Sequence, residues 1–150
     1  MFPLSFGRTI EVPVTNGAIK STMEMVLNKL VERIREKEPR NIDYNERRIT
    51  FTGGFFRFRG NWNLLVSINY GEIDIVPTSN KILISYKLLF GELFVLASLV
   101  TTLFAYFIFS SGFSIQNLGV VAGIWLWFFG VNFIITVVRF HLLVRTASRK

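Results

Sequence analysis

The arrangement of apolar and polar positions divides the chain into two unlike parts. From Leu93 to Val138 no side chain is charged, whereas residues 1–89 alternate between apolar and polar positions over short stretches. Small polar residues within 110–117 divide this uncharged run into two apolar stretches. A helix needs about 20 apolar residues to cross the hydrocarbon core of a bilayer, and about 17–25 are tolerated. The pattern therefore predicts a transmembrane hairpin of two helices, about 90–109 and 118–138, joined by a short turn.

The first part of the chain carries the periodicities of a small α+β domain. Over 21–37, apolar residues recur every three or four positions, which is the spacing of a helix with one buried face. Ser21 and Glu24 form the S-x-x-E pattern of a capping box and predict the start of this helix. Alternation typical of half-buried strands is found at 8–14, 49–52, 56–59, 64–70 and 82–88. At Gly71 the alternation changes phase, which indicates either a bulge or a hairpin turn.

The order of these elements predicts the fold class. One strand, one helix and then several strands make a two-layer α+β domain, in which one helix covers one face of a mostly antiparallel sheet. We assign this N-terminal domain to residues 1–89, the two-helix transmembrane hairpin to 90–138 and a basic tail to 139–150. No long linker separates the last predicted strand from the first apolar helix. We therefore expect the domain to lie close to the bilayer surface.

The distribution of charge predicts how the chain lies in a membrane. The formal net charge is +7, and the tail 139–150 holds four Lys or Arg residues and no acid. Basic residues directly after a transmembrane helix mark its cytoplasmic end, and the N-terminus lacks the pattern of a signal peptide. The sequence thus predicts an integral protein of a bacterial-type inner membrane or plasma membrane, with both termini cytoplasmic.

The chain carries few residues that could support catalysis or bind a metal. It has one histidine and no cysteine. A zinc site needs several histidine, cysteine or carboxylate ligands, and a hydrolase triad needs a histidine beside a nucleophile and an acid, so we expect neither. We expect no metal, no cofactor and no enzyme activity. Glu92, at the start of the first apolar stretch, is a candidate intramembrane acid for an ion or proton. The alternative, which we prefer, is a carboxylate stabilised by the dipole of a helix N-terminus.

Basic side chains are the candidates for contact with anionic lipid headgroups or an acidic partner. Arg57 and Arg59 alternate with aromatic residues, and Arg139 and Arg145 follow the second apolar stretch. A basic residue near a bilayer surface contributes about 1 kcal/mol to binding of anionic lipid. The alternative for Arg57 and Arg59 is an ordinary solvated strand face. The sequence lacks the motif of an RNA-recognition domain, so nucleic acid is not an expected partner.

Small residues within the apolar stretches predict close helix packing. Gly119, Gly123 and Gly130 form one row, which begins with a G-x-x-x-G pattern. Ala97, Thr101 and Ala105 form a second row on the first helix, and Asn132 is expected to hydrogen-bond with Thr101 or Thr102 across the hairpin. The rows could pack on each other within one hairpin or on the helices of another chain.

The combination of packing rows with absent catalytic groups favours a non-enzymatic function. We expect a membrane interaction module or accessory subunit, which docks through its transmembrane helices on other subunits or on a second copy and presents its cytoplasmic domain. The first alternative is a ligand-sensing effector whose hairpins assemble into a pore. The second is a membrane enzyme that acts on lipid through Glu92 or through Arg57 and Arg59.

Overall fold

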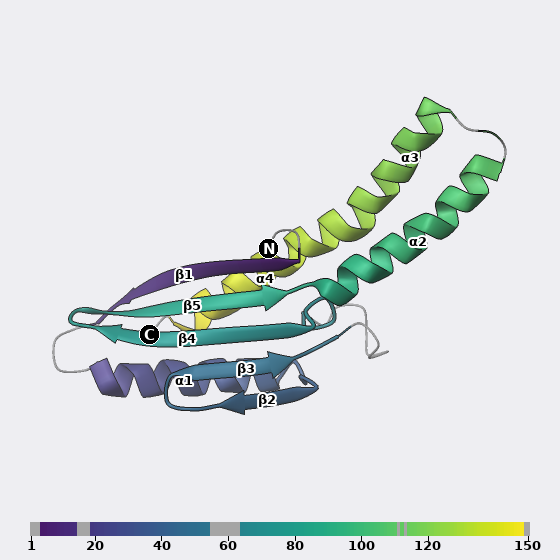
Figure 1. Ribbon diagram of the computed structural model, residues 1–150. Coiled ribbons are helices and arrows are strands. Elements are labelled where there is room, and N and C mark those ends of the chain that lie inside the picture. The colour runs from purple at the N-terminus through teal and green to yellow at the C-terminus, as the bar shows by residue number, and fades with distance from the viewer. Residues whose placement is uncertain (1–3, 15–18, 55–63, 111, 113, 149–150) are drawn as a thin grey trace.

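A computed structural model of the chain describes residues 4–14, 19–54, 64–110, 112 and 114–148 (Figure 1). In chain order its elements are β1 (Ser5–Pro13), α1 (Ile19–Arg35), β2 (Asn41–Tyr44), β3 (Arg48–Thr52), β4 (Tyr70–Thr78), β5 (Lys81–Leu89), α2 (Gly91–Ser110), α3 (Ile115–Trp125), the π-helical segment η1 (Leu126–Val131) and α4 (Asn132–Ala147). The strands form one antiparallel sheet in the order β1-β5-β4-β3-β2. The predicted α+β domain followed by two long apolar helices is therefore confirmed.

One face of the sheet is apolar and forms the floor of the hydrophobic core. The strand register places Ile49, Ile73 and Tyr86 side by side on β3, β4 and β5, and each is at most 2% exposed. The row next to it joins Phe51 to Leu88 across β4 in the same way. Because successive side chains on a strand point to opposite faces, every second residue of these strands faces this core.

The opposite face of the sheet is polar. Arg48 Nε donates to Asp74 Oδ1 at 2.7 Å, and another nitrogen of Arg48 lies 2.9 Å from Glu72. Lys81 Nζ lies 2.9 Å from Glu11 Oε1 on the neighbouring strand β1. Within the described residues no group of three or more His, Cys, Asp or Glu side chains could hold a metal ion. This face has the character of a solvated surface.

Helix α1 covers part of the apolar face with the stripe that its periodicity predicts. Leu30 and Ile34 are fully buried, and the helix contacts both β4 and β5. The predicted capping box is wrong, because the helix begins at Ile19 and Ser21 already lies inside it. The helical pattern thus located the buried face, while the cap pattern did not mark the start of the helix.

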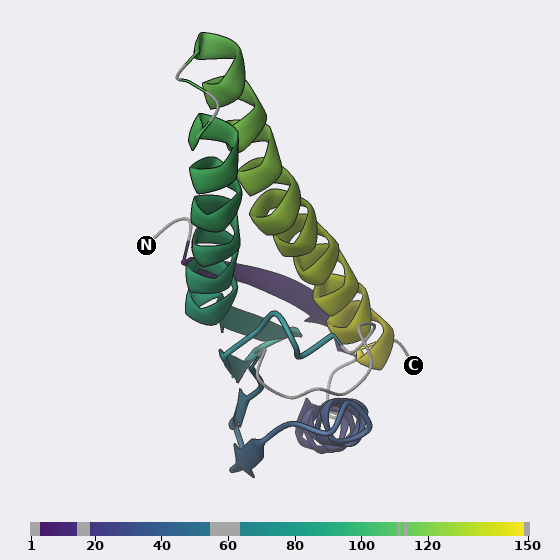
Figure 2. The ribbon, with the colours of Figure 1, turned by 90° about the vertical axis from the view of Figure 1, so that its right-hand side faces the viewer.

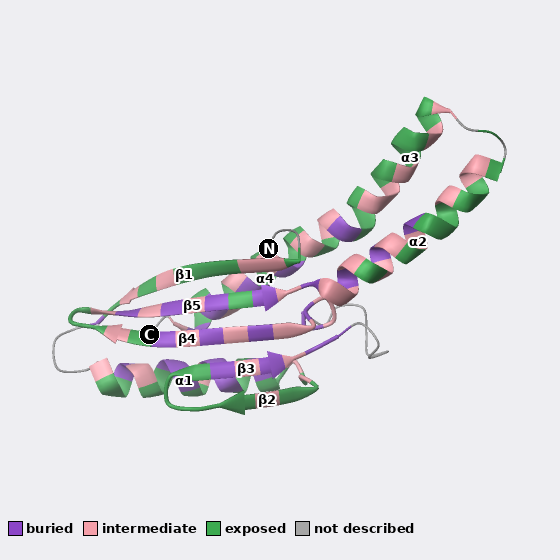
Figure 3. Ribbon diagram, in the orientation of Figure 1, coloured by how far each residue is buried: buried purple, intermediate pink, exposed green. Residues whose placement is uncertain are grey.

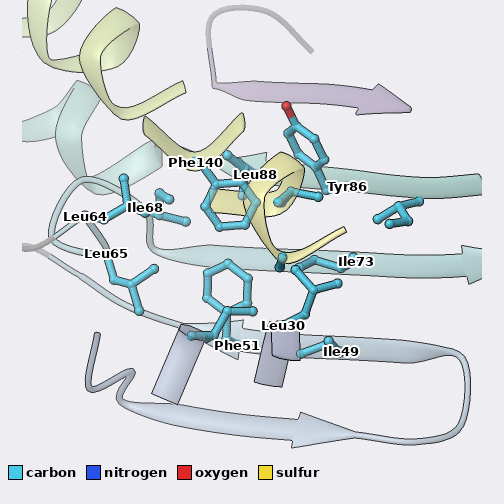
Figure 4. Packing of buried hydrophobic residues seen from close by; sticks show 14 of the residues in the cluster. Leu30, Ile49, Phe51, Leu64, Leu65, Ile68, Ile73, Tyr86, Leu88 and Phe140 are labelled. Carbon is cyan, nitrogen blue, oxygen red and sulfur yellow. The ribbon is translucent and has the colours of Figure 1, made fainter. Parts of the chain in front are cut away.

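The C-terminal part of α4 covers the rest of the apolar face, beside α1 (Figure 4). The ring of Phe140 stacks on Phe51 at 5.7 Å between centroids and lies 5.3 Å from the ring of Tyr86. Phe140 and Val144 are fully buried. The structure therefore differs from the expected tail at 139–150: most of this segment is a core helix of the domain, because its buried residues recur at helical spacing toward the sheet.

The strand predicted at 64–70 is wrong, since residues 64–67 form turns. The segment folds back on the end of β3, where the amide of Gly54 donates to the carbonyl of Leu65 at 3.2 Å. Leu65 and Ile68 are buried and close one end of the core. Their apolar spacing therefore reflects burial in a loop and not a ladder of hydrogen bonds.

Gly71 lies within β4, so the structure contains neither a bulge nor a turn at this position. Its partner in the register is Phe51, and a Cβ built on Gly71 would overlap the Phe51 ring. Glycine is required here because the ring lies directly across the strand.

The two apolar helices leave the sheet together at one end and project away from the domain (Figures 1 and 2). They are α2 and the continuous helix Ile115–Ala147, built from α3, η1 and α4, and each is long and apolar enough to cross a membrane. Only 17% and 11% of their most apolar windows are buried (Figure 3), whereas the core helix of a soluble protein is mostly buried. Such an extended apolar surface requires lipid or another protein to cover it.

The helices are joined by a short turn. Gly112 has a φ of +121°, which disfavours side chains other than hydrogen. Ser114 caps α3 by accepting a hydrogen bond from the Asn117 amide at 3.1 Å, and the Asn117 side chain donates to the carbonyl of Gly112 at 2.9 Å. Ser114 and Asn117 thus satisfy one amide and one carbonyl of the backbone at the turn.

The close approach at Gly71 yields a stability prediction. Gly71→Ala places a methyl group into the Phe51 ring, and overpacking of this kind costs about 1–3 kcal/mol. We expect a lower melting temperature in scanning fluorimetry of the detergent-solubilised protein. Gly7→Ala on the edge strand β1 is the control, because the nearest atom to its Cβ would lie 3.4 Å away. An equal melting temperature for Gly71→Ala and the wild type would contradict the packing described here.

Candidate functional site at the junction of hairpin and sheet

The hairpin is held together by the row of small residues on α2. Ala97 and Thr101 are 3% and 6% exposed, and Ala105 is half-buried farther along the helix. The side of α2 that carries them packs on α3 and η1. The first small-residue row therefore serves the contact within the hairpin.

Aromatic side chains fill the hairpin interface nearer to the domain. Phe94 of α2 lies edge-on to Trp125 at 5.9 Å and to Phe129 at 5.7 Å between ring centroids. Trp125 Nε1 donates to Ser98 Oγ at 3.2 Å, so its polar group is satisfied by protein. Trp127, two residues on, is 68% exposed. The mid-helix tryptophans thus have different environments, one inside the hairpin and one on its outer surface.

The second small-residue row takes no part in the hairpin contact. A Cβ built on Gly119, Gly123 or Gly130 would have no described atom within 4 Å beyond its own helix. At about 100° per residue Gly119, Gly123 and Leu126 share one side of the α-helix, and Leu126 is 61% exposed. Gly119 and Gly123 are exposed and face away from α2, whereas Gly130 lies in the π-helical segment η1 and is half-buried.

The predicted hydrogen bond from Asn132 to Thr101 or Thr102 is wrong. Asn132 Nδ2 donates at 2.7 Å to the carbonyl of Phe128 in its own helix, and Thr102 donates to the carbonyl of Ser98 at 2.8 Å. Asn132 is exposed and precedes Phe133, whose ring lies 4.7 Å from Phe90 just before α2. The amide therefore lies at the domain end of the hairpin and not at mid-membrane depth.

The junction between hairpin and sheet is built from aromatic rings. Phe90, which links β5 to α2, is fully buried, and Phe133 lies against both Phe90 and Phe6 of β1. About two helical turns farther on, Phe140 enters the sheet core between Phe51 and Tyr86 (Figure 4). Rings from three strands, the β5–α2 connection and α4 therefore fix the hairpin to the domain.

His141 lies at the edge of this junction. Its Nδ1 is 3.2 Å from the hydroxyl of Tyr86. Burial lowers the pKa of His141 below its ordinary value, and the charges of Arg8 and Arg145 lower it further. Burial also raises the pKa of Tyr86. Both shifts favour the neutral forms of the two groups, and the pair forms a polar contact between α4 and the sheet.

Glu92 lies in the first turn of α2, at the domain end of the hairpin. Its carboxylate lies against Gly54, where a Cβ would be 2.8 Å from Glu92 Oε2. A carboxylate in the first turn is stabilised by the helix dipole. The position agrees with the interpretation of Glu92 as a residue of the helix start.

The structure describes two of the four basic residues predicted to contact anionic lipid or an acidic partner. Arg139 and Arg145 are exposed on α4, whereas Arg57 and Arg59 lie outside the described residues. A cleft of about 360 Å³ lies between α1 and α4, and Arg33, Lys37 and Arg139 line it. Sequence reasoning missed Arg33 of α1 and Lys37 in the turn that follows it, because nothing in the sequence pairs α1 with α4.

In comparisons with known proteins, no family model, no curated protein and no solved structure matches this chain.

The environment of His141 predicts a pH dependence of stability. Its folded-state pKa lies below the value of about 6.5 in an unfolded chain, so below pH 6.5 the unfolded state binds more protons. Stability should therefore fall as the pH drops through 6.5 and the unfolded chain takes up its proton. NMR titration of this single histidine in untagged protein should give a pKa below 6.5.

His141→Asn provides the control, since the variant should lose the part of the pH dependence that arises near neutrality. A measured His141 pKa above 6.5 would show that an attractive charge, and not burial beside two arginines, dominates this site.

Proposed function

We propose that this chain is a non-enzymatic integral membrane interaction module. It docks on a transmembrane helix of another subunit, or of a second copy, and holds its small α+β domain at the membrane surface. The observation that carries the proposal is the orientation of the glycine row, Gly119, Gly123 and Gly130, which no described part of the chain covers.

The energetics of helix packing in lipid support this use of the row. Apolar side chains gain little by leaving lipid for another helix, so association depends on close backbone approach between small residues. The hairpin already achieves its own contact through Ala97 and Thr101. Glycine in a helix interior is about 1 kcal/mol less favourable than alanine. The exposed Gly119 and Gly123 are thus costly for an isolated hairpin and useful for a docked one.

The continuity of the second helix supports the role of the domain. Ile115–Ala147 runs from the hairpin turn into the sheet core without a break, and α2 begins directly after the buried Phe90. A partner that binds the hairpin would therefore also fix the orientation of the domain.

Charge supports an orientation with the domain and both termini in the cytoplasm of a bacterial-type inner or plasma membrane. Both ends of the hairpin join the domain, so the two termini share one side. Arg139 and Arg145 lie on that side, whereas the turn carries no charge, as expected for a cytoplasmic domain under the positive-inside rule.

The docking face can be tested by filling it. Gly119→Leu and Gly123→Leu should weaken association, because a large side chain prevents backbone approach while it raises helix propensity. We would extract the protein from its native membrane in mild detergent and measure the mass and composition of the complex. The variants should shift the mass toward that of one 17.3 kDa chain with its detergent.

Leu118→Phe is the matched control, since Leu118 is 51% exposed and lies about 100° around the helix from Gly119 and about 140° from Gly123. Its complex should keep the wild-type mass. A complex of wild-type mass in both glycine variants would refute docking through this row. A complex of identical chains that conducts ions in vesicles would instead favour the pore-forming alternative.

A further inference from the structure

From the structure we infer that the open edge of β1 receives an extended acidic segment of a partner protein, which adds one more strand to the sheet. Strand β1 is the last strand on its side of the sheet (Figures 1 and 2), and Arg8 projects from it. This inference concerns the α+β domain and does not depend on the proposed docking through the glycine row.

The main chain of β1 has one row of hydrogen-bonding groups that β5 does not use. The carbonyl of Leu4 accepts from the amide of Phe90 at 2.8 Å, and the amide of Val14 donates to the carbonyl of Asn80 at 3.0 Å. Both pairs continue the register of β1 with β5. Because the bonds between antiparallel strands alternate along each strand, the even-numbered residues of β1 bond to β5. The N–H and C=O groups of the odd-numbered residues therefore point toward the open edge.

This edge is long, regular and accessible. Gly7, Thr9 and Glu11 are exposed, and the exposed surface of Gly7 is main chain because glycine has no side chain. Pairing with β5 runs without a bulge from Ser5 to Pro13, and Pro13, at the far end, lacks an N–H. A long edge of this kind is a template on which another strand can pair.

Charge selects an acidic segment. Arg8 lies opposite Tyr86 in the register and projects to the same face of the sheet, where the Tyr86 hydroxyl is 3.2 Å from Nδ1 of His141. Arg145 lies one turn beyond His141 on the same side of α4, and the charges of Arg8 and Arg145 both act on His141. In the described part of the chain neither arginine forms an ion pair. Two guanidinium groups therefore lie beside this edge without a described carboxylate.

The geometry of an added strand defines the pattern of the segment. Phe6 and Ile10 lie two residues before and after Arg8 on the same face, and both are half-buried against the core. Cross-strand neighbours lie about 4.5–5.5 Å apart and project to the same face, so an Asp or Glu opposite Arg8 reaches its guanidinium. Residues two places before and after that acid would lie beside Phe6 and Ile10. The fitting segment is therefore apolar-x-acid-x-apolar.

A second copy of this chain is a poorer occupant of the edge. Antiparallel pairing of β1 with β1 of another copy would bring the Arg8 and Arg145 side chains of both copies to one seam. Like charges across paired strands are destabilising. Arg8 thus disfavours pairing of the edge with itself and favours a strand that carries an acid.

An anionic lipid headgroup is also a poorer occupant, because the site lies too far from the hydrocarbon core. Helix α2 is about 30 Å long, which equals the thickness of that core, and Phe133 lies level with its start, since its ring is 4.7 Å from that of Phe90. His141 follows about 12 Å farther along the helix, and Arg145 about 18 Å. The headgroup layer is about 5–7 Å thick on each side. A lipid also offers no row of main-chain groups to match the edge.

The test is amide hydrogen exchange, measured by NMR on the full-length protein in phosphatidylcholine nanodiscs. In the protein alone, the amides of Gly7 and Glu11 should exchange faster than those of Arg8 and Ile10, which bond to β5. The probe is the capped heptapeptide Thr-Val-Thr-Glu-Thr-Val-Thr, which carries the pattern. An excess of this peptide should slow exchange at Gly7 and Glu11. The same peptide with Gln in place of Glu should bind up to about fivefold more weakly, as expected for loss of one exposed ion pair.

Two pairs of variants separate strand addition from other causes. Thr9→Pro removes an outward N–H and leaves the bonds to β5 in place, so it should abolish the effect of the peptide. Thr9→Ala also loses the hydroxyl contact with Ser85 but keeps the amide, and should bind the peptide like the wild type. Arg8→Gln should weaken binding up to about fivefold. Arg47→Gln removes the same charge from an exposed position between β2 and β3 and should not. Melting temperatures establish that each variant is folded.

Three results would overturn the inference. The first is unchanged exchange at Gly7 and Glu11 in a large excess of the peptide. The second is equal binding of the Glu and Gln peptides, which would remove the role of the acid. The third is slow exchange of the same amides without peptide once phosphatidylglycerol replaces phosphatidylcholine in the nanodisc, which would identify a lipid headgroup as the occupant.

Discussion

The packing of Phe140 between Phe51 and Tyr86 is the interaction on which the rest of the structure depends. It places the end of a 33-residue helix, whose other end is the hairpin turn, inside the core of the sheet. Without it, α1 alone would cover the apolar face, and the core would lose fully buried side chains of α4 such as Val144. The same contact also requires Gly71, because the Phe51 ring that supports Phe140 occupies the space of a side chain there. Hairpin and domain are thus one folded unit. A small domain can bury only a modest core, and the end of the second apolar helix adds buried side chains to the core of this one.

This arrangement gives each surface a separate use. The outer face of the sheet is polar and carries the ion pairs of Arg48, while the small residues of α2 close the hairpin. The glycine row is the surface on which we propose that a helix of a partner docks, and it lies on the continuous helix that also contains Phe140.

Sequence periodicity was sufficient wherever local pattern and burial agree. The helix predicted at 21–37, which is found at Ile19–Arg35, and the strands at 49–52 and 82–88 follow from spacing, because one face of each is buried. The two apolar helices follow from their length and their lack of charge. Periodicity failed where burial comes from distant segments. Residues 64–70 alternate like a strand, yet 64–67 form turns over the core. The short and exposed strand β2 (Asn41–Tyr44) carries almost no pattern. At the basic end of the chain, the buried residues Phe140, Val144 and Ala147 belong to the core. The orientation of the two small-residue rows, and the meeting of Arg33 with Arg139, depend on how helices rotate and pair, which no local pattern specifies.

The claim that domain and hairpin form one rigid unit is tested most directly by a distance between them. The chain has no cysteine, so spin labels can be placed at Met25→Cys on α1 and Leu103→Cys on α2, which are 46% and 63% exposed. Double electron–electron resonance in lipid nanodiscs should give a single narrow distance distribution, and adding Phe140→Ala should broaden it. A broad distribution in the protein without that substitution would contradict the account, because it would mean that the domain moves independently of the hairpin.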